Sequence, residues 1–156
     1  MVWDGSALTV NGNIISTGNI VNNAVTQQGG SSANNDVQSN GTWITILQGS
    51  YVQPGQSGSV SVVTSCYVTL GQSYSIYGSF PTPSYFRLYR CYDNTTEVLL
   101  SEWSIGLFTV LATWSIFDTI GSDSQVFYRV KAYDISETYS STLYQNRSLI
   151  VLATKK

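Results

Sequence analysis

From residue 42 onward the chain is a succession of short segments that alternate apolar and polar residues. The segments cover residues 42–48, 57–69, 72–79, 84–92, 96–103, 107–117, 124–134 and 143–154. Turn-forming pairs such as Pro54-Gly55 and Asp93-Asn94 separate them. β-branched and aromatic residues fill the segments, and no long helical periodicity interrupts them. The pattern predicts an all-β fold, an antiparallel β-sandwich of roughly eight strands.

The same alternation predicts which side of a strand is buried. In the second segment Val60, Val62, Cys66 and Val68 share one face, so we expect Cys66 to pack as a small buried hydrophobe. A disulfide to Cys91, in a separate predicted strand, is the alternative. Two thiols in a chain without His or a CxxC pair argue against zinc. We therefore expect neither a metal nor a cofactor.

Residues 1–26 form a small apolar unit of their own. Asn11-Gly12 lies between two apolar runs and predicts a β-hairpin, since both central residues of a type I′ turn need a positive φ. Val21, Ala24 and Val25 follow with the i, i+3, i+4 spacing of a short helix. The unit is thus predicted to be a hairpin followed by a short helix.

This N-terminal unit is too small to be stable alone, because segments below ~40 residues usually need a disulfide, a metal or oligomerisation. It contains no Cys and no His, which leaves association with copies of itself as the simplest route. The side chains expected at that interface are Trp3, Leu8, Ile14, Ile20, Val21 and Val25.

A polar run separates this unit from the predicted strands. Residues 27–41 read QQGGSSANNDVQSNG and include only Ala33 and Val37 as apolar residues. The run is predicted to be a flexible or surface-tracing linker. The expected organisation is therefore an N-terminal segment at 1–26, a linker at 27–41 and a sandwich domain at 42–156.

Charge and hydropathy exclude several classes of protein. Only 10% of the residues are charged, against a usual ~25%, so neutral polar residues must solvate the surface. This is typical of β-rich extracellular or virion proteins. With a net charge of −2 and seven dispersed Lys and Arg residues, the sequence has no basic cluster of the kind that binds nucleic acid. No apolar run approaches the ~20 residues of a membrane span, and no signal peptide is visible.

Two stretches carry a resemblance to a known family. Residues 1–26 resemble the short "DGS-L-V-G-I … TG-I-N-AVT" elements towards the distal part of central tail-fibre, or host-specificity, proteins of tailed bacteriophages. Residues 146–156, NRSLIVLATKK, resemble the closing strand of phage tail-fibre β-domains. The resemblance implies a homotrimer at the virion tail tip. Its partners would be other tail-fibre or baseplate proteins and a bacterial surface receptor, either a glycan or an outer-membrane protein.

Catalytic signatures are weak. The chain has no His, the commonest general base. Asp93 with Glu97, or Asp118 with Asp123, are the carboxylate pairs to consider for glycoside hydrolysis. Each lies at a predicted turn or strand end, where a solvated charge or an Asx-turn is the ordinary explanation. We therefore expect a protein that is not an enzyme.

Aromatic residues near predicted loops are the remaining functional candidates, because rigid rings bind sugars and anchor protein contacts at little entropic cost. The candidates for receptor contact are Phe80, Tyr85, Tyr92, Trp103, Tyr139 and Tyr144. The leading hypothesis is a homotrimeric tail-fibre component whose sandwich recognises the host receptor. The alternative is a secreted, monomeric β-sandwich adhesion or carbohydrate-binding module with the hairpin docked on its own domain.

Overall fold

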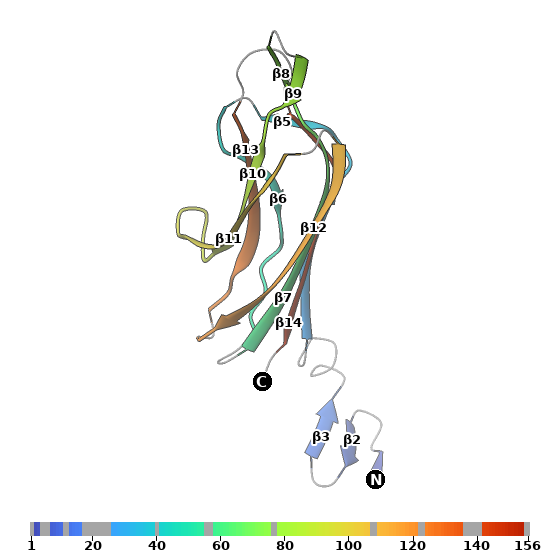
Figure 1. Cartoon of the computed structure of the whole chain (residues 1–156). Helices are drawn as coiled ribbons and strands as arrows, with labels where there is room; N and C mark the ends of the chain where they lie inside the picture. Colours follow the sequence, from blue (N-terminus) through green and yellow to red (C-terminus); the bar gives the residue numbers. More distant parts are fainter. Residues whose placement is uncertain are drawn as a thin grey trace.

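The protein is a sandwich of two antiparallel sheets (Figure 1). The computed structural model describes residues 2–3, 7–10, 13–16, 26–39, 41–54, 58–75, 78–106, 109–121, 124–135 and 142–154. Every regular element within these ranges is a β-strand, and none of them contains a helix of the length and hydropathy needed to cross a membrane. The prediction of an all-β sandwich is confirmed.

One sheet has four strands, in the order β11-β10-β13-β6. These strands are β6 (Ile44–Gln48), β10 (Ser84–Cys91), β11 (Glu97–Ile105) and β13 (Phe127–Asp134). The central pair is in continuous register from Ser84 opposite Asp134 to Cys91 opposite Phe127. A bulge between Leu88 and Tyr89 shifts the pairing of β10 with β11.

The other sheet has the order β12-β7-β14-β4, with β5 as an additional partner of β14. These strands are β4 (Thr26–Ala33), β5 (Val37–Ser39), β7 (Gly58–Thr69), β12 (Thr109–Ile120) and β14 (Thr142–Thr154). The closing strand β14 lies between β7 and β4. β14 is therefore an inner strand of this sheet.

Two smaller sheets complete the fold. β8 (Gln72–Ser75) pairs with β9 (Gly78–Pro81). At the N-terminal end, β1 (Val2–Trp3), β2 (Ala7–Val10) and β3 (Asn13–Ser16) form a three-stranded sheet. Val10 lies opposite Asn13, so the predicted hairpin is confirmed. The expected helix, and the side chains expected at the trimer interface (Trp3, Leu8, Ile14, Ile20, Val21 and Val25), lie outside the described residues.

The prediction of a linker at 27–41 is wrong. Residues 26–33 pair with β14 over eight positions, and β5 pairs with the other end of the same strand. The segment between β4 and β5 is also anchored, because Arg147 donates to the backbone carbonyl and the side-chain oxygen of Asn35 at 2.9 and 2.8 Å. Gln145 donates to Asp36 at 2.8 Å. A polar run is a strand here because β14 supplies the pairing partner.

The core lies between the two sheets and is built from the inward residues of the alternating strands. Val60, Val62, Cys66 and Val68 of β7 are all buried, as their spacing predicts. Cys66 and Cys91 are both free thiols and both buried, so the packing interpretation of Cys66 is confirmed. Burial raises the pKa of each thiol to about 11. The largest fully buried side chains are Tyr128, Tyr144, Phe86 and Phe127.

A buried ion pair joins the two sheets at one end of this core. Arg90 of β10 donates from one guanidinium nitrogen to the carboxylate of Asp118 of β12 at 2.8 Å. The hydroxyl of Tyr128 of β13 donates to the other oxygen of Asp118 at 2.9 Å. We refer to these three residues as the inter-sheet clasp.

Candidate functional site

The outer face of the four-stranded sheet carries several charged and aromatic side chains. Its residues lie in rows that cross the strands, because the register places side chains of the same face opposite one another. One row joins Ser104, Tyr85 and Tyr133, and the next joins Glu102, Arg87 and Lys131. The two rows together form one continuous surface.

Three aromatic rings form a cluster at one end of this face. The rings of Trp43 and Tyr133 stack with centroids 5.4 Å apart, and Tyr85 lies 6.2 Å from Tyr133. Arg87 places its guanidinium 4.2 Å from the centre of the Trp43 ring and pairs with Glu102. Trp43 is 36% exposed, and both tyrosines are half-buried. We call Trp43, Tyr85, Tyr133 and Arg87 the aromatic platform.

The platform has the features of a binding surface for a ring or a flat apolar group. Neighbouring rings hold each other in place, so little side-chain entropy remains to be lost on binding. The guanidinium of Arg87 and the carboxylate of Glu102 lie beside the rings and supply hydrogen-bond donors and acceptors. Aromatic rings pack against the apolar C–H face of a sugar while adjacent hydrogen-bonding groups meet its hydroxyls, and the same combination suits a protein loop.

A second cluster on the same face is fully paired. Glu97 accepts hydrogen bonds from Arg129 and, at 2.6 Å, from Lys131. Arg129 also donates to Gln48 at 3.0 Å. Burial raises the pKa of Glu97, but the hydrogen bonds and charges of Lys131 and Arg129 outweigh this and hold it below its ordinary value. A carboxyl with a lowered pKa is ionised at neutral pH and is unsuited to act as a general acid.

The other carboxylates considered for catalysis have structural partners where they are described. Asp93 caps a turn, because it accepts the backbone N–H groups of Thr95 and Thr96 and both hydroxyls. These bonds lower the pKa of Asp93 to about 2. Asp118 belongs to the inter-sheet clasp, and Asp123 lies outside the described residues. Among the described residues no three His, Cys, Asp or Glu side chains gather as metal ligands.

The structure places the six aromatic candidates in different surroundings. Tyr85 lies on the platform. Tyr144 is completely buried and its hydroxyl bonds Ser84 at 2.7 Å, so the prediction that it contacts a receptor is wrong. Trp103 packs inward, 4.3 Å from Trp114 between ring centres.

Tyr92 is also packed against the core, with the guanidinium of Arg90 5.5 Å from its ring centre. Neither Tyr92 nor Trp103 faces outward as expected of a receptor contact. The side chains of Phe80 and Tyr139 lie outside the described residues.

Loop proximity found only Tyr85 of the platform. Trp43 precedes a strand, while Tyr133 and Arg87 lie within strands. The available signal was alternation, which puts Tyr133 on the same side of its strand as Lys131, opposite the buried Val130 and Ala132. The sequence does not show that β6, β10 and β13 are neighbours.

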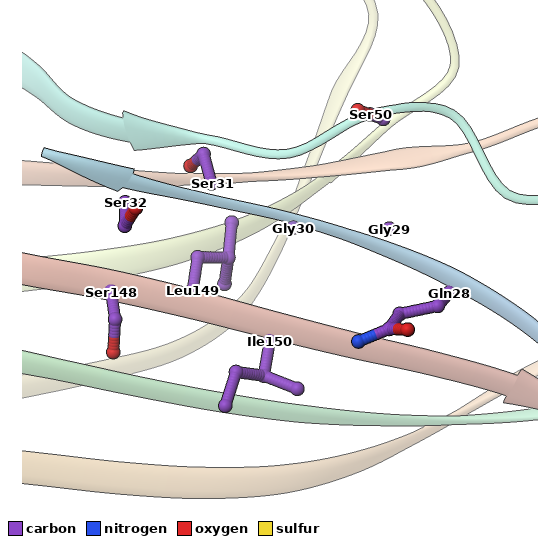
Figure 2. A pocket seen from close by; sticks show the side chains of 9 residues that line it. All are labelled: Gln28, Gly29, Gly30, Ser31, Ser32, Ser50, Ser148, Leu149 and Ile150. Atoms are coloured by element: carbon purple, nitrogen blue, oxygen red, sulfur yellow. The ribbon is translucent and has the colours of Figure 1, made fainter.

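The outer face of the five-stranded sheet has a different character. It is hollowed near the edge strand β4, where a depression of about 500 Å³ is lined by Gln28, Gly30, Ser32, Ser148 and Ile150 among others. Figure 2 shows the bare backbone at Gly29 and Gly30 between the side chains of Gln28 and Ser31. A Cβ atom at Gly30 would lie 2.4 Å from the carbonyl oxygen of Leu149, so the close approach of β4 to β14 requires glycine there. We call this depression the glycine hollow.

Comparison with known proteins adds only a distant structural likeness. No protein-family profile matches the chain. No curated protein sequence matches it either. Among solved structures, the chain is similar to one titled "Bacillus endospore appendages form a novel family of disulfide-linked pili", with a TM-score of 0.43 and 11% identity. That match covers 85% of this chain and 90% of the other.

Proposed function

We propose that this chain is a non-catalytic binding component of a trimeric bacteriophage tail fibre, and that the aromatic platform contacts the receptor on the host surface. The observation that carries the binding role is the outward cluster of Trp43, Tyr133 and Tyr85 with Arg87 beside it. The resemblance of residues 1–26 and 146–156 to tail-fibre proteins supports the virion setting and the trimer.

The contrast between rings and carboxylates favours binding over catalysis. The rings of the platform lie on the outer face, with Trp43 36% exposed, whereas Glu97 is engaged by Arg129 and Lys131 and Asp93 caps its own turn. Retaining and inverting glycosidases need one carboxyl that is protonated at working pH. The lowered pKa values of Glu97 and Asp93 do not supply it.

The proposal is tested with the full chain, labelled with a fluorophore and added to a panel of bacterial cells and their immobilised surface polysaccharides. We expect saturable binding to some members of the panel without release of reducing sugar. Sugar release by the pure protein would overturn the non-catalytic assignment. Absence of binding to every cell and polysaccharide would overturn the binding role.

Light scattering on the same preparation distinguishes a trimeric tail-fibre component from a monomeric secreted module. A trimer mass supports the tail-fibre proposal, and a monomer at high micromolar concentration supports the secreted adhesion module. Tyr139→Ala, in the segment 136–141 that the structure leaves undescribed, tests whether binding extends beyond the platform.

A further inference from the structure

The outer face of the five-stranded sheet is uncharged. Along β12, β7, β14 and β4 the outward positions hold Ser, Thr, Gln, Gly and apolar residues, and none of these described positions carries a charge. Large apolar side chains are exposed there, and the most exposed are Phe117, at 85%, and Leu111, at 62%. Contiguous exposed apolar groups on a sheet mark an interaction surface. We call this surface the uncharged face.

A protruding ring and a hollow lie on opposite sides of this face. Phe117 is on the edge strand β12, and the glycine hollow is at the opposite edge, on β4 and β14. The register places them at one level, because Phe117 lies opposite Ser61, which lies opposite Leu152, which lies opposite Gln28. Gln28 lines the glycine hollow.

We propose that the uncharged face binds copies of the same chain in a closed trimer, with Phe117 of each copy seated in the glycine hollow of the next. A contact between two different patches is heterologous, and copies joined by it form a closed oligomer only if each step involves no translation along the symmetry axis. Since the Phe117 side chain and the glycine hollow are level along the strands, a rotation about an axis parallel to the strands relates neighbouring copies without translation. This inference rests on the trimer of the proposed function and names its interface.

The dimensions of the face set the size of such a contact. β12, β7, β14 and β4 are 12, 12, 13 and 8 residues long, so at ~4.8 Å between strands and ~3.3 Å per residue the face covers roughly 700 Å². A ring of three divides this area between two neighbours, so each contact takes roughly 350 Å² from each partner, about half of what a standard interface takes. The glycine hollow, at about 500 Å³, has room for one phenyl ring. The lack of charge favours a second copy as occupant, because the two halves of one neutral face meet without burying an unpaired ion.

Engineered cysteines test the contact in the full chain. Phe117→Cys combined with Gln28→Cys should give a covalent trimer on oxidation, read on a non-reducing gel, while each single variant stays monomeric on that gel. The single variants also control for the native thiols, which are buried at 1% and 0% exposure. Sedimentation of the unmodified chain measures the assembly in parallel.

The possible outcomes distinguish a failure of the proposed interface from a failure of the proposed trimer. A trimer in solution without cross-linking in the double variant overturns the interface and leaves the proposed trimer standing. A monomer in solution overturns both. Covalent dimers from Phe117→Cys alone indicate two-fold packing and also overturn the inference.

Phe117→Ser gives an independent test that needs no oxidation. It should raise the concentration at which half of the chain is monomeric by at least tenfold. Leu99→Ser is the matched control, because Leu99 is 48% exposed but lies on β11 of the other sheet. Equal effects of the two changes, or no effect of Phe117→Ser, would overturn the inference.

Discussion

Removing the carboxylate of Asp118 should cost more stability than the loss of any ion pair on the surface. Asp118 has a side-chain exposure of 8% and Arg90 of 15%, so both charges of the pair are largely shielded from water. The Asp118→Ala change deletes the acceptor of Arg90 at 2.8 Å and of the Tyr128 hydroxyl at 2.9 Å. It leaves a shielded guanidinium and a buried hydroxyl without the partner that joined the sheets.

The magnitude follows from these groups. Breaking a buried ion pair by removing one partner costs ~3–5 kcal/mol. The partial exposure of Arg90 lets water reach it and favours the lower end, about 3 kcal/mol. Since small domains are stable by ~5–15 kcal/mol, this is a large share of the total. The two sheets would then lose their polar link at that end of the core.

Equilibrium urea unfolding at a fixed protein concentration measures the effect. Glu102→Ala is the control, because Glu102 pairs with Arg87 at 46% and 34% side-chain exposure, and such pairs contribute ~1 kcal/mol or less. Combining Arg90→Met, Asp118→Leu and Tyr128→Phe should recover most of the loss, since apolar replacements of similar size are often neutral. A loss below about 1 kcal/mol for Asp118→Ala, or no recovery in the triple variant, would refute this reasoning.

Three further predictions concern the strands, a turn and the thiols. Truncation after Gln145 should abolish cooperative unfolding, because it removes the part of β14 that pairs with both β7 and β4; a native-like melting transition would contradict this. For Asp93, the pKa falls from 3.8 to about 2 on folding, so its carboxylate stabilises the fold above pH 4 and this contribution is lost as the pH falls towards 2. Wild type should therefore be more stable than Asp93→Asn at pH 7, and this difference should shrink as the pH falls through 2; an unchanged difference would contradict the assignment. Cys66 and Cys91 should both resist alkylation at pH 8 in the native protein and both react in urea, whereas a disulfide would leave them unreactive without reductant.

The alternating pattern was enough to predict most of the strands and the buried side of β7. It could not predict β4, because the sequence QQGGSSA carries no apolar period. This strand forms because β14 offers an unpaired edge and because Gly30 lets the two backbones approach. Pairing of this kind depends on tertiary context and leaves no local signal.

The candidate site was predicted less well, for a related reason. Proximity to a turn suggested that Tyr144 is exposed, but its position in β14 points it inward to Ser84. Trp43 and Tyr133 come together only because β6 and β13 are neighbours, and this pairing of distant segments cannot be read from one sequence. Tyr85 alone was both predicted and found on the platform.

The platform is tested most directly by the affinity of Trp43→Ala for the cells or polysaccharide that wild type binds. Loss of the stacking ring should weaken binding about tenfold, the equivalent of ~1.4 kcal/mol, with unchanged assembly by light scattering. Leu99→Ala, on the same sheet but outside the platform, should bind as wild type does. Unchanged affinity in Trp43→Ala, at the same assembly state, would contradict the claim that this face recognises the target.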